Sequence, residues 1–446
     1  MKKFLKLLSA LAITLICTLL FASCGSGDES SEETNDYNGE TIVINVFNWG
    51  EYISDGFEDS LDTNAAFEEY YFKKFGKKVK VNYSTYATNE DMYSKLKSGA
   101  GSYDIVIPSD YMIDKMIKED MLIPFGASSI KNYRNISSEF KNLYYDPQNL
   151  YSVPYTYGML GIIYNSALVD EEDIDAAKWG WGLLWDENYK GKILQFNNPR
   201  DAFGSAMYYA GIDVNSKNKA DWDAALALLS KQKPLVQAYV NDEIFNKMAT
   251  ASAAIAPYFA GDFITMAADN EDLKFYYPSE GSNLFVDAMC IPKSSKNPEV
   301  AKEYINFMLS PEPAIANAIY IGYASPNKEV LKSKEYAEAM EETCEGAMEI
   351  LYGESHIEVN RKYIAKFGPN SYCYESFPDD IQEHVNILWE SLKTENSTEL
   401  WVHITTAVIV VAVLTLAIYS VVIEKKRSKD YRLRDKMKRQ AKLQKS

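Results

Sequence analysis

The sequence is poor in the residues that build metal and redox centres. Its 446 residues include three histidines and five scattered cysteines, which is little material for a zinc or iron–sulfur site. No GxSxG, HExxH or P-loop motif occurs, and the SxxK match at Ser128–Lys131 lacks the SDN and KTG motifs of penicillin-binding enzymes. We therefore expect no resident metal or other cofactor.

Clustered basic residues are also missing from most of the chain. Lysine and arginine total 46 against 63 acidic residues, which gives a formal net charge of −17. The positive charge gathers at the ends, because residues 424–446 hold eleven basic and three acidic side chains. Contacts with nucleic-acid phosphates need clustered Lys and Arg, so nucleic acid is not expected as a partner.

Long apolar runs occur only at the two ends. The first follows Met1-Lys-Lys and leads to small residues before Cys24, which is the pattern of an export signal. Residues 1–23 are predicted to be a lipoprotein signal peptide, because the sequence resembles a lipobox in which Cys24 is lipidated. A plain signal peptide with an incidental cysteine is the alternative. Residues 24–40 are polar and acidic and are predicted to form a disordered tether.

The second apolar run, residues 401–423, has the length of a transmembrane helix. Trp401 and Tyr419 stand where interfacial aromatic residues belong, and the basic tail 424–446 follows directly. Basic residues that flank a membrane span stay on the cytoplasmic side, so we expect a cytoplasmic tail, an exported body and attachment to the cell membrane. An amphipathic core helix is the alternative, but the run has no polar face. A second anchor, a remnant of a permease fusion and a docking helix for a permease remain open as its role.

The exported body keeps only three cysteines, Cys290, Cys344 and Cys373. At most one disulfide is possible, with Cys344–Cys373 favoured by position, and buried free thiols fit equally well.

Between the two ends, β-branched runs alternate with helical patterns, which predicts an α/β fold with a mostly parallel sheet covered on both faces. The expected order is strand, helix, strand, helix, strand over 41–48, 56–75, 78–84, 89–97 and 103–108. The same alternation is predicted again at 192–196, in a helix after Pro199, and at 219–231, 235–240 and 253–259. Two α/β lobes are therefore predicted.

Aromatic rings and carboxylates occupy nearly every loop that follows a predicted strand. In open sheets, ligands lie beyond the carboxyl ends of strands, where such loops meet. An isolated ring or acid there is more often core or rim, but six loops repeat the same two residue types. This combination suits an aliphatic chain with ammonium groups, because carboxylates accept charge-assisted hydrogen bonds and rings cover methylenes while attracting cations.

At these loops the sequence resembles the spermidine/putrescine-binding proteins, the extracytoplasmic receptors of polyamine ABC transporters, over roughly residues 41–395. The matching segments are NWGEY at Asn48–Tyr52, YSTYATNEDMYSKLKSG at Tyr83–Gly99, YDIVIPSDYMIDKM at Tyr103–Met116, YSVPYTYG at Tyr151–Gly158 and IGYASPN at Ile321–Asn327. The resemblance implies a two-lobe, type II periplasmic-binding-protein fold without enzymatic activity. Its expected partners are a polyamine, putrescine or spermidine or both, a membrane permease with its ATPase, and the lipid membrane.

The resemblance also implies a division into lobes. Lobe I would combine residues 41–152 with 285–322, and lobe II would combine 153–284 with 323–395. Crossover strands near Ser152–Tyr155 and Phe285–Ile291 would form a hinge, and the ligand would be captured when the lobes close.

Thirteen ligand-binding residues are implied by position-by-position comparison with the family. They are Trp49, Glu51, Tyr52, Ser109, Tyr111, Asn198, Asp201, Phe259, Asp262, Phe285, Asp287, Tyr323 and Glu375. The chain departs from the spermidine-binding pattern at four positions: Asn198 stands where aspartate is frequent, Gly50 where a hydroxyl residue is common, and Phe259 and Phe285 where tryptophans are usual. The preference between putrescine and spermidine stays open.

Three other functions compete with this interpretation. Paired carboxylates in a cleft can serve a glycoside hydrolase, and aromatic rings can stack on a sugar in a receptor for another solute, such as a sugar or an amino acid. A structural surface protein is the third. The excess of acids without matching bases favours an amine ligand.

Overall fold

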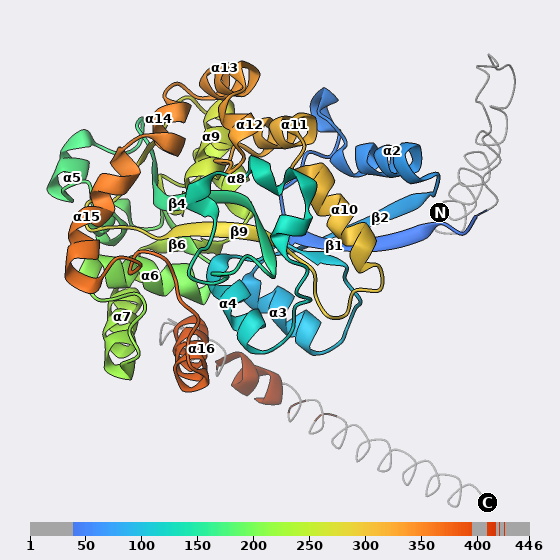
Figure 1. Ribbon diagram of the computed structural model, residues 1–446. Helices are drawn as coiled ribbons and strands as arrows, with labels where there is room; N and C mark the ends of the chain where they lie inside the picture. The colour runs from blue at the N-terminus through green and yellow to red at the C-terminus, as the bar shows by residue number, and fades with distance from the viewer. Residues whose placement is uncertain (1–38, 395–407, 416–418, 420–422, 424–446) are drawn as a thin grey trace, which may run out of the picture.

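The computed structural model describes residues 39–394, 408–415, 419 and 423 (Figure 1). The predicted signal peptide with Cys24, nearly all of the tether, the basic tail and most of the predicted span 401–423 lie outside these residues. Within the described ranges, no helix is both long and apolar enough to cross a bilayer.

The described strands form a sheet in the order β2-β1-β3-β9-β4-β7-β5-β6, with β8 beside β4. Their bounds are β1 (Ile42–Trp49), β2 (Val79–Tyr86), β3 (Ile105–Val106), β4 (Ser152–Asn165), β5 (Ile193–Phe196), β6 (Val236–Val240), β7 (Ile255–Phe259), β8 (Leu273–Tyr276) and β9 (Leu284–Cys290). The β1 strand pairs in parallel with β2 and β3, and β5 pairs in parallel with β6 and β7. Each half therefore contains parallel pairs, but the sheet is mixed rather than mostly parallel, because β9 pairs antiparallel with β3 and β4, and β4 pairs antiparallel with β7 and β8.

Two antiparallel strands, β4 and β9, connect the halves. Residues 152–159 of β4 pair with β9, whereas residues 160–165 pair with β7 and β8. A third connection lies beside them, where the Tyr157 amide donates a 3.0 Å hydrogen bond to the Ala324 carbonyl. The chain thus passes between the two halves near one line across the sheet.

Helices cover each half of the sheet. In Figure 1 the helices α2, α3 and α10 lie toward one end of the sheet, and α5, α6, α7 and α15 lie toward the other. The first half carries α2 (Thr63–Phe75), α3 (Asn89–Lys97), α4 (Asp110–Lys118), α10 (Pro298–Met308) and α11 (Pro311–Ile321). The second half carries α5 (Glu171–Ala176), α6 (Pro199–Ala210), α7 (Lys219–Gln232), α8 (Glu243–Ala249) and α9 (Ala260–Asp269). The C-terminal helices are α12 (Lys328–Leu331), α13 (Lys334–Thr343), α14 (Ala347–Tyr352), α15 (Ser355–Phe367) and α16 (Asp379–Thr394).

Helix caps fix the polar residues that follow two of the strands. Thr88 ends the β2 loop and accepts a hydrogen bond from the Asp91 amide at the start of α3. Asn198 does the same for α6 by accepting from the Asp201 amide, with Pro199 in the first turn. A side-chain acceptor satisfies an amide that the first helical turn leaves without an intrahelical partner, so these loops are held rigidly at the carboxyl ends of their strands.

The hydrophobic core lies between the sheet and its helices. On α7, for example, Trp222, Ala225 and Leu229 are buried, and Leu226 is partly buried. The three described cysteines are free, so no disulfide joins Cys344 to Cys373 in this structure.

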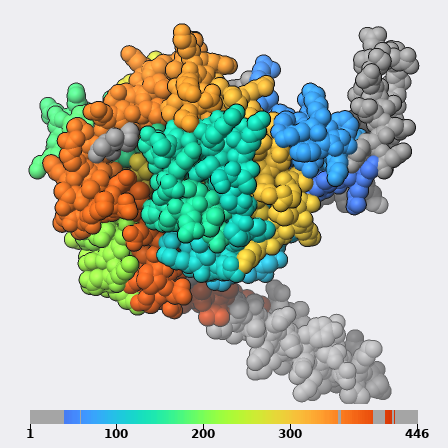
Figure 2. All heavy atoms as spheres, in the orientation of Figure 1, coloured from blue at the N-terminus to red at the C-terminus, as the bar shows by residue number. Residues whose placement is uncertain are grey.

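The two halves touch each other away from the connecting strands as well. The Lys118 side chain at the end of α4 donates to the Ser376 hydroxyl, which donates to Asp114 of the same helix. The Tyr144 hydroxyl donates to the Tyr374 carbonyl. Figure 2 shows the teal segment near residues 110–150 lying against the orange C-terminal segment on the face turned to the viewer. The two halves are therefore in contact on this face as well as at the connecting strands.

Candidate functional site

A cavity of about 90 Å³ lies between the two halves of the molecule. Twelve of the thirteen residues expected from the sequence line it: Trp49, Glu51, Tyr52, Ser109, Tyr111, Asn198, Asp201, Phe259, Asp262, Phe285, Asp287 and Tyr323. Residues from loops that are far apart in the sequence thus meet beyond the carboxyl ends of the strands.

The register of the strands explains this convergence. In the first half, Trp49 at the end of β1 pairs with Tyr86 at the end of β2, and both rings line the cavity. In the second half, Phe196 pairs with Val240, so the loops that carry Asn198 and Asp242 leave the sheet side by side. The carboxyl ends of both parallel units face the same space.

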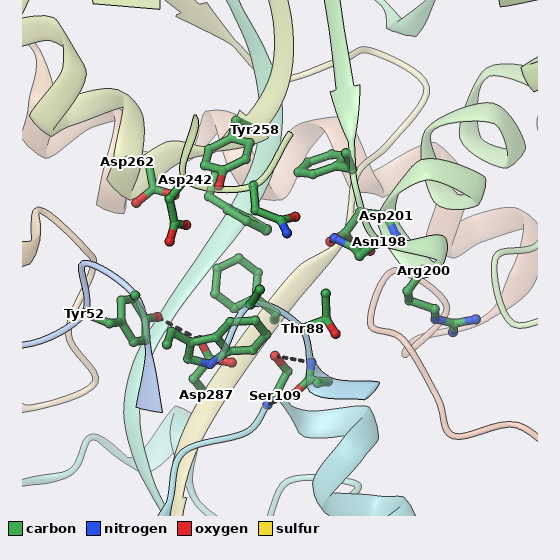
Figure 3. Close-up of a pocket in the computed structure, with 18 of the residues that line it drawn as sticks. Tyr52, Thr88, Ser109, Asn198, Arg200, Asp201, Asp242, Tyr258, Asp262 and Asp287 are labelled. Atoms are coloured by element: carbon green, nitrogen blue, oxygen red, sulfur yellow. Dashed lines mark hydrogen bonds between the residues drawn. The ribbon is translucent and has the colours of Figure 1, made fainter. Parts of the chain in front are cut away.

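Asp287, on β9, is the most deeply buried carboxylate of the cavity, with an exposed fraction of 3%. The Tyr52 hydroxyl donates a 2.7 Å hydrogen bond to its Oδ2 (Figure 3). The other oxygen, Oδ1, is buried and has no hydrogen-bond partner among the described residues. Burial raises the pKa of Asp287 to about 7. A buried acceptor without a partner is costly, so this site is built for a donor that the chain does not supply.

Two further buried carboxylates stand on opposite sides of the cavity (Figure 3). Asp262, in the first turn of α9, accepts a 2.9 Å hydrogen bond from the Tyr323 hydroxyl, and burial raises its pKa to about 8. Asp201, in the first turn of α6, accepts a 2.9 Å hydrogen bond from the side-chain amide of Asn198, and burial raises the pKa of Asp201 to about 6. Figure 3 shows Asp287 between and below them.

Aromatic side chains form the walls between these carboxylates. The Tyr52 and Tyr323 rings meet edge to face with 4.9 Å between centroids, and the Phe259 and Phe285 rings do so at 5.3 Å. The Trp49 ring is fixed by a 2.9 Å hydrogen bond from its Nε1 to the Ile107 carbonyl. Such walls suit an apolar chain and attract positive charge at their faces.

Arg200 is the only basic side chain among the described lining residues. Its guanidinium carbon lies 3.8 Å from the Phe377 ring centroid and 4.2 Å from that of Tyr374. One of its nitrogens donates to the Asn215 side chain at 2.8 Å. Figure 3 shows the guanidinium directed away from the carboxylates, so the middle of the cavity keeps its negative character.

One expected residue lies elsewhere. Glu375 is not among the lining residues, and its neighbour Tyr374 takes that place. The main chain of Glu375 is used instead, because its amide donates to Asn215 at 2.8 Å and its carbonyl accepts from Arg200 at 3.2 Å. A one-residue shift in an ungapped comparison reverses which side chain faces inward in this extended segment.

The sequence interpretation missed several lining residues, among them Glu90, Arg200, Asp242, Tyr258 and Tyr374. Glu90 follows β2, and Asp242 follows β6. The same strand-end rule would have found both, had it been applied to these two strands. No comparable signal marks Arg200, because its position at the cavity depends on the aromatic cage formed by residues distant in sequence.

Comparison with known proteins agrees with this architecture. A family model described as bacterial extracellular solute-binding protein matches residues 65–342. The spermidine/putrescine-binding periplasmic protein of Salmonella typhimurium is 34% identical over 64% of this chain and 78% of its own length. That of Escherichia coli is 31% identical over 75% of this chain and 90% of its own length.

Solved structures lead to the same group. A putative spermidine/putrescine ABC transporter protein from Listeria monocytogenes superimposes with a TM-score of 0.65 at 34% identity, covering 79% of this chain and 99% of that one. A spermidine/putrescine transporter substrate-binding protein from Streptococcus pneumoniae gives a TM-score of 0.59 at 34% identity, covering 79% and 98%. The two-lobe, type II binding-protein fold and the resemblance stated from the sequence are thereby confirmed. The chain belongs to the bacterial extracellular solute-binding proteins.

Proposed function

We propose that this receptor captures a polyamine, putrescine or spermidine or both, between its lobes and delivers it to the permease of an ABC transporter. The observation that carries the proposal is the set of three buried carboxylates, Asp201, Asp262 and Asp287, around a cavity whose only described basic side chain is turned away. The names of the relatives point to the same ligands.

The ligand chemistry follows from what the cavity lacks. A buried carboxylate without a cation is unfavourable, and the raised pKa values of the three acids express that cost. An ammonium group supplies up to three donors and a full charge, which restores the ionised form. The aromatic walls cover the methylenes, and each favourable cation–ring contact contributes about 0.5–2 kcal/mol.

A sugar or an enzyme reaction fits less well. A sugar receptor needs paired donors and acceptors for hydroxyl groups, whereas the buried oxygens here are acceptors that favour a donor ligand. A hydrolase needs one of its acids to face a scissile bond with a water opposite. The three acids instead stand apart among rings, as a linear cation requires, so we propose binding without catalysis.

Capture would occur by closure of two lobes about β4, β9 and the segment beside Ala324. Lobe I would comprise residues 41–152 and 285–322, and lobe II would comprise residues 153–284 and 323–395, the division that the family resemblance implies. The proposal is supported by Glu51, Tyr52 and Ser109 reaching the cavity from one side and Asn198, Asp201 and Asp262 from the other. Closure excludes water and strengthens each ammonium–carboxylate contact.

The exported body would be held at the cell membrane by both ends of the chain. The sequence supports a lipid on Cys24 and a span over 401–423 with a cytoplasmic tail. Residues 408–415 are helical, and their large apolar side chains are left exposed by the body, for example Val411 at 61% and Leu414 at 57%. An apolar helix that its own protein does not cover suits a bilayer.

A thermal-shift assay across ligand classes tests the proposed function. The melting temperature should rise with putrescine or spermidine at micromolar to millimolar concentrations and stay constant with amino acids and oligosaccharides, because only ligand that binds the folded state stabilises it. A shift with a sugar or an amino acid but with neither polyamine would contradict the proposal.

A further inference from the structure

Two carboxylates outside the buried set lie at the mouth of the cavity. Glu51 follows β1 in lobe I, and Asp242 follows β6 in lobe II, so each lobe contributes one. Both residues line the cavity and both are exposed. Neither side chain forms a hydrogen bond or an ion pair with any residue in the part of the chain that the structure describes.

The absence of a side chain at Gly50 permits this arrangement. A Cβ atom at position 50 would stand 2.4 Å from Oδ2 of Asp242 and 3.3 Å from its Cγ. Any other residue at position 50 would therefore push the Asp242 carboxylate away. The Asp242 carboxylate thus crosses from lobe II into space that a lobe I side chain would fill.

The negative charges at the cavity mouth favour a bound cation. Burial, Glu51 and Glu243 raise the pKa of Asp242, in that order, and Asp242 and Glu51 both add to the raised pKa of Asp262. Inside the same cavity, the buried Oδ1 of Asp287 lacks a partner, which independently indicates a ligand that donates a hydrogen bond. The described residues contain no group of three or more acids, histidines or cysteines placed to hold a metal ion, so an ammonium group fits better than a metal.

We propose that Asp242, together with Glu51, forms an ammonium subsite at the cavity mouth that favours a ligand with three positive charges over one with two. The inference rests on the proposed polyamine function and assigns a selectivity role to Asp242. The buried acids Asp201, Asp262 and Asp287 already suffice for a diamine. Figure 3 shows Asp242 beside Asp262 on the side opposite Asp201, where a longer chain would carry its additional ammonium group.

Titration calorimetry of the full-length protein with spermidine and with putrescine tests the subsite. The variant Asp242→Asn keeps the shape of the side chain and removes its charge. We expect its affinity for spermidine to fall about three- to fivefold at low ionic strength, which is the size of an exposed charge pair, and its affinity for putrescine to stay within about 1.5-fold. The difference should shrink as salt is added, because exposed charges are screened.

Two further variants complete the design. Asp269→Asn removes an exposed charge from the same lobe outside the cavity, and it should leave both affinities unchanged. Gly50→Ala keeps the Asp242 carboxylate and adds no polar group, but its Cβ displaces that carboxylate, so it should reduce the preference for spermidine as Asp242→Asn does.

The outcomes distinguish a failure of the subsite from a failure of the proposed polyamine binding. If Asp242→Asn lowers the affinity for both ligands equally, or for neither, the proposed subsite is wrong, while polyamine binding by the unchanged protein stands. A Gly50→Ala variant that keeps the full preference would also overturn the subsite. If the unchanged protein binds neither spermidine nor putrescine, the proposed function is wrong and the subsite with it.

Discussion

At the scale of single residues, the cavity is defined by carboxyl groups whose pKa values are raised by burial to about 6 in Asp201, about 7 in Asp287 and about 8 in Asp262. Burial disfavours the ionised form, and of the described cations only Arg200 acts against it, at Asp201. These groups are therefore partly protonated near neutral pH until a cation enters. Ligand binding and proton release are linked as a result.

Polyamine affinity should consequently depend on pH with a definite sign. Below pH 6 the three carboxyls are mostly neutral and attract an ammonium group weakly, so affinity should rise as the pH increases from about 6 to about 8. Binding at pH 7 should release protons, chiefly from Asp262. Calorimetry in two buffers with different ionisation enthalpies measures that release, and an affinity that is constant from pH 6 to pH 8 would contradict the linkage.

The stability of the empty receptor should show the opposite trend. Because the folded-state pKa values of these acids exceed the unfolded value of about 3.9 for Asp, their contribution to stability is complete below that value and is lost as the pH rises through about 6 to 8. A bound polyamine should restore it, which melting curves with and without ligand would record.

At the scale of structural elements, much of the fold could be predicted because local signals were strong. The predicted helix at 89–97 agrees with α3, and the strand at 41–48 differs from β1 by one residue at each end. The predicted helix at 56–75 begins too early, because Gly56 adopts a φ of 90° and Asp62 caps α2 at Thr63. Nothing local reveals that β4 runs for 14 residues and pairs with different strands along its length.

The candidate site was predictable to the extent that it depends on strand ends. The loops after β1, β5 and β7 supplied Glu51, Asp201 and Asp262, whereas the loops after β2 and β6 were overlooked and with them Glu90 and Asp242. Which neighbour faces inward in an extended segment, as at Tyr374, is decided by tertiary packing and is not visible in the residue pattern.

The contact between α9 and the loop after α11 gives a prediction at this scale. A Cβ at Gly261 would lie 2.3 Å from the Tyr323 ring, so Gly261→Ala should displace the ring and break its hydrogen bond to Asp262. We expect the free energy of unfolding to fall by about 1–3 kcal/mol, and polyamine affinity to fall about tenfold, as the loss of one hydrogen bond to a charged group implies.

Gly182→Ala is the matched control, because its Cβ would meet the nearest atom at 3.3 Å on the Tyr209 ring, away from the cavity. It should leave the affinity unchanged. Equal affinities of the Gly261→Ala variant and the unchanged protein would show that Tyr323 does not position Asp262.

At the scale of the whole molecule, the proposed capture requires that two lobes close on a ligand. Gly50, which follows β1, lies against Asp242, which follows β6, with the Asp242 Cγ 3.3 Å from the place of a Cβ at position 50. Such proximity suits a disulfide between cysteines at the two positions. A cross-link would therefore report closure.

The double variant Gly50→Cys with Asp242→Cys should form this disulfide faster when putrescine is present, because the ligand shifts the population toward the closed form. Mobility on non-reducing gels measures the rate, and the two single variants control for the native free cysteines. Equal rates with and without putrescine would contradict ligand-driven closure.

The central claim, that buried carboxylates bind a polyamine, is tested most directly by titration calorimetry of the unchanged protein and of Asp287→Asn with putrescine and spermidine. Removing one partner of a buried, hydrogen-bonded charge pair typically costs at least about 2 kcal/mol. We therefore expect Asp287→Asn to bind both ligands at least about thirtyfold more weakly than the unchanged protein. An affinity for both polyamines within about twofold of the unchanged protein would contradict it.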